Sequence, residues 1–117
     1  MNKLICPNGT LEICVAKTFF SRFLGLMFMP RDSFCGALLI QKCSSVHTFF
    51  MRFCIDVVFL DKSNKVLRVV KNLKPWRVVT PISCASSVLE LKSGFADKYI
   101  IKEGITLLFE FSDCNEK

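Results

Sequence analysis

The chain has 117 residues, a formal net charge of +6, and a hydrophobic share of 51%. A chain of this length forms one domain, residues 1–117, and its twelve phenylalanines supply ample material for a core. No apolar run approaches the roughly 20 residues that a membrane-spanning helix needs. The first ten residues lack the apolar segment of a secretory signal, so we expect a cytoplasmic protein without a membrane span.

The excess of positive charge does not by itself indicate nucleic-acid binding. Six cations recur at every third position: Lys62, Lys65, Arg68, Lys71, Lys74 and Arg77. Alternate residues of an extended strand share a face, so this spacing distributes the cations over both faces of a strand. A solvated hairpin and loop accounts for the pattern, and we do not expect a nucleic-acid partner.

The seven cysteines are odd in number and include no CxxC pair. In a reducing compartment such thiols behave as small hydrophobic residues. Cys43 and His47 have the spacing of one metal-ligand pair, but structural zinc usually needs two such pairs. Glycine-rich phosphate loops are absent as well. The sequence therefore predicts no metal and no other cofactor.

The N-terminal residues predict a β-hairpin over residues 3–16. Asn8-Gly9 is a strong signal for a two-residue hairpin turn, because such a turn needs positive φ at both central residues. A turn at these two residues pairs Cys6 with Leu11. Apolar residues then share the buried face: Leu4, Cys6, Leu11, Ile13 and Val15.

A helix is predicted next, at about residues 18–28, with Thr18 as its N-cap and Pro30 after its end. Its apolar residues recur at steps of three and four: Phe19, Phe20, Phe23, Leu24, Met27 and Phe28. This stripe is typical of a helix that packs on a core.

The rest of the chain has the pattern of short strands. The predicted strands cover residues 36–40, 55–61, 65–71, 87–91 and 105–111, with a turn at 62–64 and Trp76 in a loop. Many short strands and one N-terminal helix predict a mainly β fold, α+β at the margin. We expect a compact antiparallel sandwich or a small barrel.

Three ionisable residues, His47, Arg52 and Asp56, lie within the otherwise apolar run that ends at Asp61. A buried ionised group without partners is costly, so each needs a specific reason to be there. On one continuous strand Arg52 and Asp56 would lie about 13 Å apart, so a bend or bulge near Phe53-Cys54 is expected.

Each polar residue has a structural and a functional interpretation, and both stay open. His47 either holds a backbone carbonyl at the mouth of the core or belongs to a ligand site. Arg52 and Asp56 form either a structural ion pair or backbone clamp, or part of that ligand site. Glu90 is either a further member of the site or a solvent-facing strand residue.

Four segments of the chain resemble the DUF192 family, small bacterial and archaeal domains of unknown function. They are Ala16-Lys17-Thr18 with Arg22 to Met27, Gly36 to Leu39, His47 to Asp61, and Val88 to Gly94. The resemblance implies a compact, mainly β domain with one helix, and it implies no reaction. The chain departs from the family pattern at Phe50, where tryptophan is common, and at Ile105, where aspartate is common.

These observations predict a binding or accessory module rather than an enzyme. Its ligand is an anionic small molecule or a protein partner, bound in a cleft near the His47–Asp56 segment. The expected site residues are His47, Phe50, Arg52 and Asp56, with Trp76 and Glu90 at the rim. Arg52 would bind a carboxylate through its planar guanidinium.

Two alternatives remain. One is a small hydrolase- or lyase-like enzyme that uses His47 with Asp56 or Glu90 as an acid–base pair. The other is a structural domain that binds a protein through an exposed face of the β scaffold.

Overall fold

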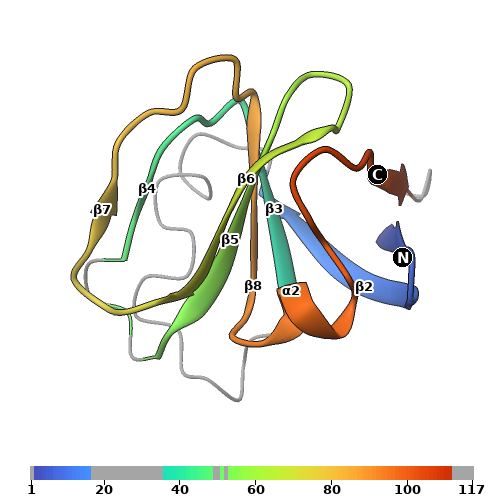
Figure 1. Cartoon of the computed structure of the whole chain (residues 1–117), viewed down its shortest axis with the longest axis horizontal. Helices are drawn as coiled ribbons and strands as arrows, with labels where there is room; N and C mark the ends of the chain where they lie inside the picture. The colour runs from blue at the N-terminus through green and yellow to red at the C-terminus, as the bar shows by residue number, and fades with distance from the viewer. Residues whose placement is uncertain (1, 17–35, 49–50, 52, 112–117) are drawn as a thin grey trace.

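The structure is a computed structural model that describes residues 2–16, 36–48, 51 and 53–111 (Figure 1). The predicted helix at about residues 18–28 and the predicted site residues Phe50 and Arg52 lie outside this part of the chain. No helix in the described ranges is long and apolar enough to cross a membrane.

The described residues form nine strands and one short helix. In chain order these are β1 (Asn2–Cys6), β2 (Gly9–Ala16), β3 (Ala37–Gln41), β4 (Val46–His47), β5 (Ile55–Leu60), β6 (Val66–Leu73), β7 (Val78–Val79), β8 (Ser87–Lys92), α2 (Phe95–Lys98) and β9 (Leu108–Glu110).

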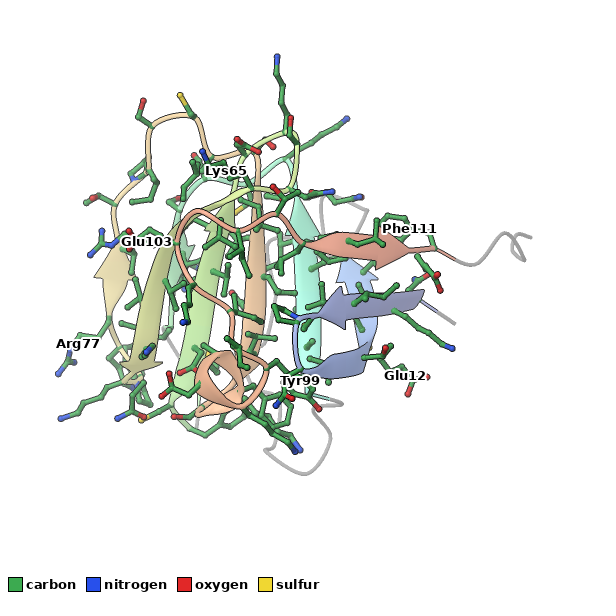
Figure 2. All side chains as sticks on the ribbon, turned by 45° about the vertical axis from the view of Figure 1, so that its right-hand side comes forward. Glu12, Lys65, Arg77, Tyr99, Glu103 and Phe111 are labelled. Carbon is green, nitrogen blue, oxygen red and sulfur yellow. The ribbon has the colours of Figure 1, made fainter. Side chains whose placement is uncertain are left out.

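Seven of the strands form one sheet in the order β6-β5-β8-β3-β2-β1-β9, and β4 pairs with β7 in a separate two-stranded ladder. The direction of the strands turns along the sheet, so β1 and β9 cross the upright central strands in Figure 2. The prediction of a mainly β domain is confirmed. One pair departs from the expected antiparallel arrangement, because β2 and β3 run parallel.

The first hairpin forms at the predicted place but in a different register. Leu4 pairs with Leu11 and Cys6 with Gly9, so the predicted pairing of Cys6 with Leu11 is wrong by two residues. Pro7 and Asn8 are the central residues of the turn, and Gly9 follows them with a φ of 137°. Proline suits the first central position of a turn, and glycine suits the position after the second. A shift of two residues keeps every side chain on its predicted face.

The long apolar run is divided between the two sheets. β4 ends at His47, and β5 begins at Ile55. The expected irregularity lies slightly later than Phe53-Cys54, because the β5–β6 register shifts between Ile55 and Val57. The predicted turn after β5 is confirmed, and the Asp61 carboxylate accepts the N–H groups of Ser63 and Lys65 there.

Hydrophobic side chains pack on both faces of the central strands. The first core lies on the face toward α2 and contains, among others, Leu4, Leu39, Val58, Leu60, Leu89, Leu91 and Ile101. The second core lies between the opposite face and the β4–β7 ladder and contains Val46, Met51, Ile55, Val57, Phe59, Val79 and Val88. Every residue of β5 is consequently buried.

Candidate functional site

The Thr48 side chain holds the loop that precedes β7. Its hydroxyl donates to the carbonyl of Lys74 at 2.7 Å and accepts the backbone N–H of Arg77 at 2.8 Å. Backbone bonds join Thr48 N–H to the carbonyl of Arg77 and Trp76 N–H to the carbonyl of Thr48. Thr48 is fully buried, so this small network is shielded from water. It gives the Lys74–Arg77 loop a defined shape.

Trp76 lies at the tip of this loop in a conformation that large residues rarely adopt. Its φ is 64°, in the left-handed region, and its side chain is 55% exposed. The left-handed backbone costs a non-glycine residue about 1 kcal/mol or more. The exposed Val78 follows, and Arg77 extends from the same edge of the molecule (Figure 2).

His47 lies beside this loop, on the outward side of the β4–β7 ladder. It pairs with the exposed Val78, whereas the preceding Val46 pairs with the buried Val79. Side chains alternate along a strand, so Val46 and Val79 face the second core and His47 faces the other way. The structure therefore brings His47 and Trp76 to one edge of the molecule.

Asp56 fastens β5 to β6 and to the start of α2. One carboxylate oxygen accepts the N–H of Asn72 at 2.8 Å, and the other accepts those of Gly94 and Ala96, both at 3.0 Å. Gly94 is the N-cap of α2, and glycine has no side chain that could accept the N–H groups of the first turn. The Asp56 carboxylate on β5 accepts the N–H of Ala96 in that turn instead. This is the backbone clamp that was one of the two interpretations of Asp56.

Glu90 is buried in the middle of β8 and does not face solvent. It lies between Val57 and Leu38 of the neighbouring strands, on the side of the second core. Its Oε1 has no hydrogen-bond partner in the described part of the chain. Desolvation raises the pKa of its carboxyl group from 4.5 to about 8, so the protonated form is favoured at neutral pH.

The predicted site residues His47, Asp56 and Glu90, which the structure describes, do not form a single cluster. Asp56 pairs with Leu91 and points toward the first core, whereas the adjacent Glu90 points toward the second core. His47 faces outward from the ladder. An acid–base pair of His47 with either carboxylate therefore receives no support from this geometry.

A pocket of about 280 Å³ adjoins the predicted segment at Phe53 and Cys54, with Lys92, Ser93 and Phe95 as its other lining residues. The described residues hold no group of three or more His, Cys, Asp or Glu side chains that could bind a metal ion.

Sequence reasoning overlooked Thr48 and the role of Arg77. Thr48 stands directly after His47, and its hydroxyl was one more polar group in the apolar run. Its partners lie 26 to 29 residues further along the chain, so no local pattern indicates them. Arg77 was noted only as the last of six regularly spaced cations.

We expect Asp56→Ala to lower the unfolding midpoint by more than 10 °C. The substitution leaves three backbone N–H groups without their acceptor, at about 1 kcal/mol or more each, and about 1 kcal/mol corresponds to roughly 4 °C in a domain of this size. Asp97→Ala is the control, because the exposed Asp97 pairs with Lys71 only at the surface. It should shift the midpoint by no more than about 4 °C. Equal effects in calorimetry would contradict the clamp.

Glu90→Gln should change the pH dependence of stability. Between pH 4.5 and about 8 the unfolded chain loses the Glu90 proton while the folded chain keeps it. The free energy of unfolding of the wild type then falls as pH rises, by up to about 1.4 kcal/mol per pH unit. Glutamine cannot ionise, so the advantage of the variant over the wild type should grow from pH 5 to pH 8 in urea titrations. Glu12→Gln, at an exposed position, is the control, and a pH-independent advantage of Glu90→Gln would refute this account.

Two solved structures share the fold. One is a protein of unknown function from Novosphingobium aromaticivorans, with a TM-score of 0.75 and 18% identity, covering 92% of this chain and 82% of that one. The other is a Sinorhizobium meliloti protein described as a proposed transcription regulator, with a TM-score of 0.70, 19% identity, and coverage of 92% and 91%. Identities this low show a common fold alone.

Sequence relatives are found among archaeal UPF0127 proteins. The protein of Thermococcus sibiricus is 36% identical over 101 residues, which are 83% of this chain and 65% of that protein. The chain thus spans slightly less than two thirds of that relative's length. A protein of Pyrococcus horikoshii is 38% identical over 98 residues, 74% of this chain and 84% of the relative.

The DUF192 pattern, described as an uncharacterized ACR, matches residues 4–109, which include all strands from β2 to β8. The resemblance seen in the four sequence segments is therefore confirmed, and the chain belongs to the DUF192 family.

Proposed function

We propose that this domain is a binding module that docks an acidic segment of a protein partner. The docking surface is the Trp76 edge, which we define as Lys74, Trp76, Arg77 and Val78 together with His47. The observation that carries the proposal is the Thr48 network, which holds an exposed tryptophan in an unfavourable backbone conformation. Conformational strain of this kind is concentrated at functional positions.

The composition of the Trp76 edge suits protein recognition. Tryptophan and arginine are enriched among the residues that contribute most to binding energy at protein interfaces. Trp76 and Val78, 55% and 59% exposed, offer apolar area to a partner. Because the loop is already ordered by Thr48, little conformational entropy remains to be lost on binding.

The charge of the edge favours an acidic partner. Lys74 and Arg77 are exposed, and one guanidinium nitrogen of Arg77 donates to the carbonyl of Pro75 at 3.3 Å, which leaves its other donors to a partner. The net charge of +6 attracts acidic chains over a longer range. Carboxylates on the partner would complete this surface.

An anionic small molecule in the pocket beside Phe53 is the second candidate. Lys92 lines that pocket and offers a cation to such a ligand. The predicted contribution of Arg52 to an anion site stays a prediction, because Arg52 lies outside the described residues.

We also propose a cytoplasmic location. No disulfide joins the five described cysteines, although two of them, Cys14 and Cys84, are exposed. Thiols of this kind persist in a reducing compartment.

We expect Trp76→Gly to lower the unfolding midpoint by no more than about 8 °C. Glycine adopts positive φ without strain, and this gain of about 1 kcal/mol offsets part of the loss of the buried indole surface, about 2–3 kcal/mol. The neighbouring Lys74→Gly is the control, because Lys74 has no positive φ to relieve and should lose stability. A fall of more than 8 °C for Trp76→Gly would show that the indole is needed for the fold.

The docking proposal predicts that poly-L-glutamate changes the fluorescence of Trp76, the only tryptophan of the chain. We expect Arg77→Ala to weaken this binding at least tenfold, about 1.4 kcal/mol. Arg68→Ala, which removes an exposed arginine from β6, should weaken it less than threefold. The Trp76→Gly protein has no reporter, so its loss of affinity is measured by calorimetry.

Two results would overturn the proposal. One is equal weakening by Arg77→Ala and Arg68→Ala, which would show only the attraction of net charge. The other is tighter, Arg77-dependent binding of duplex DNA than of poly-L-glutamate, which would indicate a nucleic-acid partner instead.

A further inference from the structure

A second pocket lies on the far side of the molecule from the Trp76 edge. It has a volume of about 340 Å³, and its lining includes Gln41, Lys42, Lys62, Ser87, Phe109 and Phe111. These residues come from the end of β3, the β5–β6 turn, the start of β8 and the β9 edge. Arg77 and Phe111 mark the two sides in Figure 2. We call this hollow the Phe109 pocket.

One wall of the Phe109 pocket is aromatic. The rings of Phe109 and Phe111 are nearly parallel, with an interplanar angle of 9° and a centroid distance of 6.0 Å. Both residues lie at or next to β9, two positions apart, so they share a face of that edge strand. Phe111 is 47% exposed. A flat, apolar group would cover this surface and remove it from water.

The opposite side of the pocket is polar and positively charged. Lys42 and Lys62 are exposed, and neither forms an ion pair with any described residue. Ser87, which is 8% exposed, places a hydroxyl donor in the same lining. Two exposed lysines in the lining of one pocket favour an anion.

The walls are held in place by bonds between segments that are distant in sequence. The N–H of Leu107 donates to the carbonyl of Asn64 at 2.9 Å, and Lys65 forms a β-bridge with Thr106. The N–H of Ser86 donates to the carbonyl of Leu60 at 2.8 Å. The hollow is thus a preformed part of the fold, and pockets of about this volume accommodate small molecules.

We infer that the Phe109 pocket binds a planar aromatic ring joined to an anionic group. The ring would lie against Phe109 and Phe111, while Lys42 and Lys62 would pair with the carboxylate or phosphate, and Ser87 would hydrogen-bond it. An aromatic carboxylate and a nucleoside monophosphate share this chemistry. The site is separate from the Trp76 edge and does not depend on the docking function proposed there.

Four probes test the inference by calorimetry and by amide chemical shifts of the full chain. Indole-3-acetate and adenosine monophosphate carry the anion, and indole-3-acetamide and adenosine are their neutral analogues. We expect at least one anionic probe to bind ten times more tightly than its analogue, with shifts at Lys42, Ser87 and Phe109. The probe that does so identifies a carboxylate or a phosphate as the source of the anion.

Variants separate this site from general attraction by positive charge. The double variant Lys42→Ala/Lys62→Ala should reduce the preference for the anion to less than twofold, and Phe111→Ala should weaken ring-containing probes at least fivefold. Lys102→Ala removes an exposed lysine elsewhere, and Trp76→Gly alters the other surface, so both should bind as the wild type does. The inference is overturned if the anionic and neutral probes bind equally, if no probe shifts the pocket amides at millimolar concentration, or if Lys102→Ala has the effect of the double variant.

Discussion

Burial of β5 and β8 on both faces is the constraint on which the rest of the structure depends. Side chains from each strand fill two separate cores. Nearly every residue of these two strands must therefore be apolar or have its charge or hydrogen-bonding groups compensated. Asp56 and Glu90 are the carboxylates in these strands, and they meet the constraint in different ways. The Asp56 carboxylate accepts three backbone N–H groups. Glu90 has its pKa raised so that the neutral form is favoured.

These two carboxylates lie on opposite faces of the sheet, and both have structural surroundings rather than a place on a binding surface. Asp56 joins β5 to Asn72 of β6 and to the start of α2, and Glu90 lies on the side of the second core. The two surfaces that we propose for binding lie instead at the two ends of the scaffold, around Trp76 and around Phe109. A rigid centre with exposed, pre-shaped loops at its margins is a common arrangement in binding domains.

Much of the fold could be predicted from the sequence, because short apolar and β-branched runs bounded by turn residues, as in β5, β6 and β8, are a local signal. The hairpin register could not, since Asn8-Gly9 and Pro7-Asn8 both suit a tight turn and only the paired strands distinguish them. α2 was missed because four residues carry no helical period, and its cap comes from Asp56, about 40 positions earlier in the chain.

The candidate site was less predictable than the fold. The run from His47 to Asp61 was interpreted as one segment, but it is divided between two sheets, with His47 in β4 and Ile55 to Leu60 in β5. Trp76 was expected in a loop and lies in one, but its left-handed backbone and its attachment to Thr48 depend on tertiary contacts. A buried Glu90 was not foreseen either, because a single glutamate between two leucines fits a half-exposed strand equally well.

The pairing of β1 with β9 has a consequence for how the chain folds. Lys3 and Glu110 are neighbours across that ladder, so almost the whole polypeptide must be present before the sheet is complete. During synthesis on a ribosome, the β1 edge of the N-terminal hairpin therefore stays unpaired until β9 has been synthesised. Contacts between such distant residues slow folding, which places closure of this edge among the late steps.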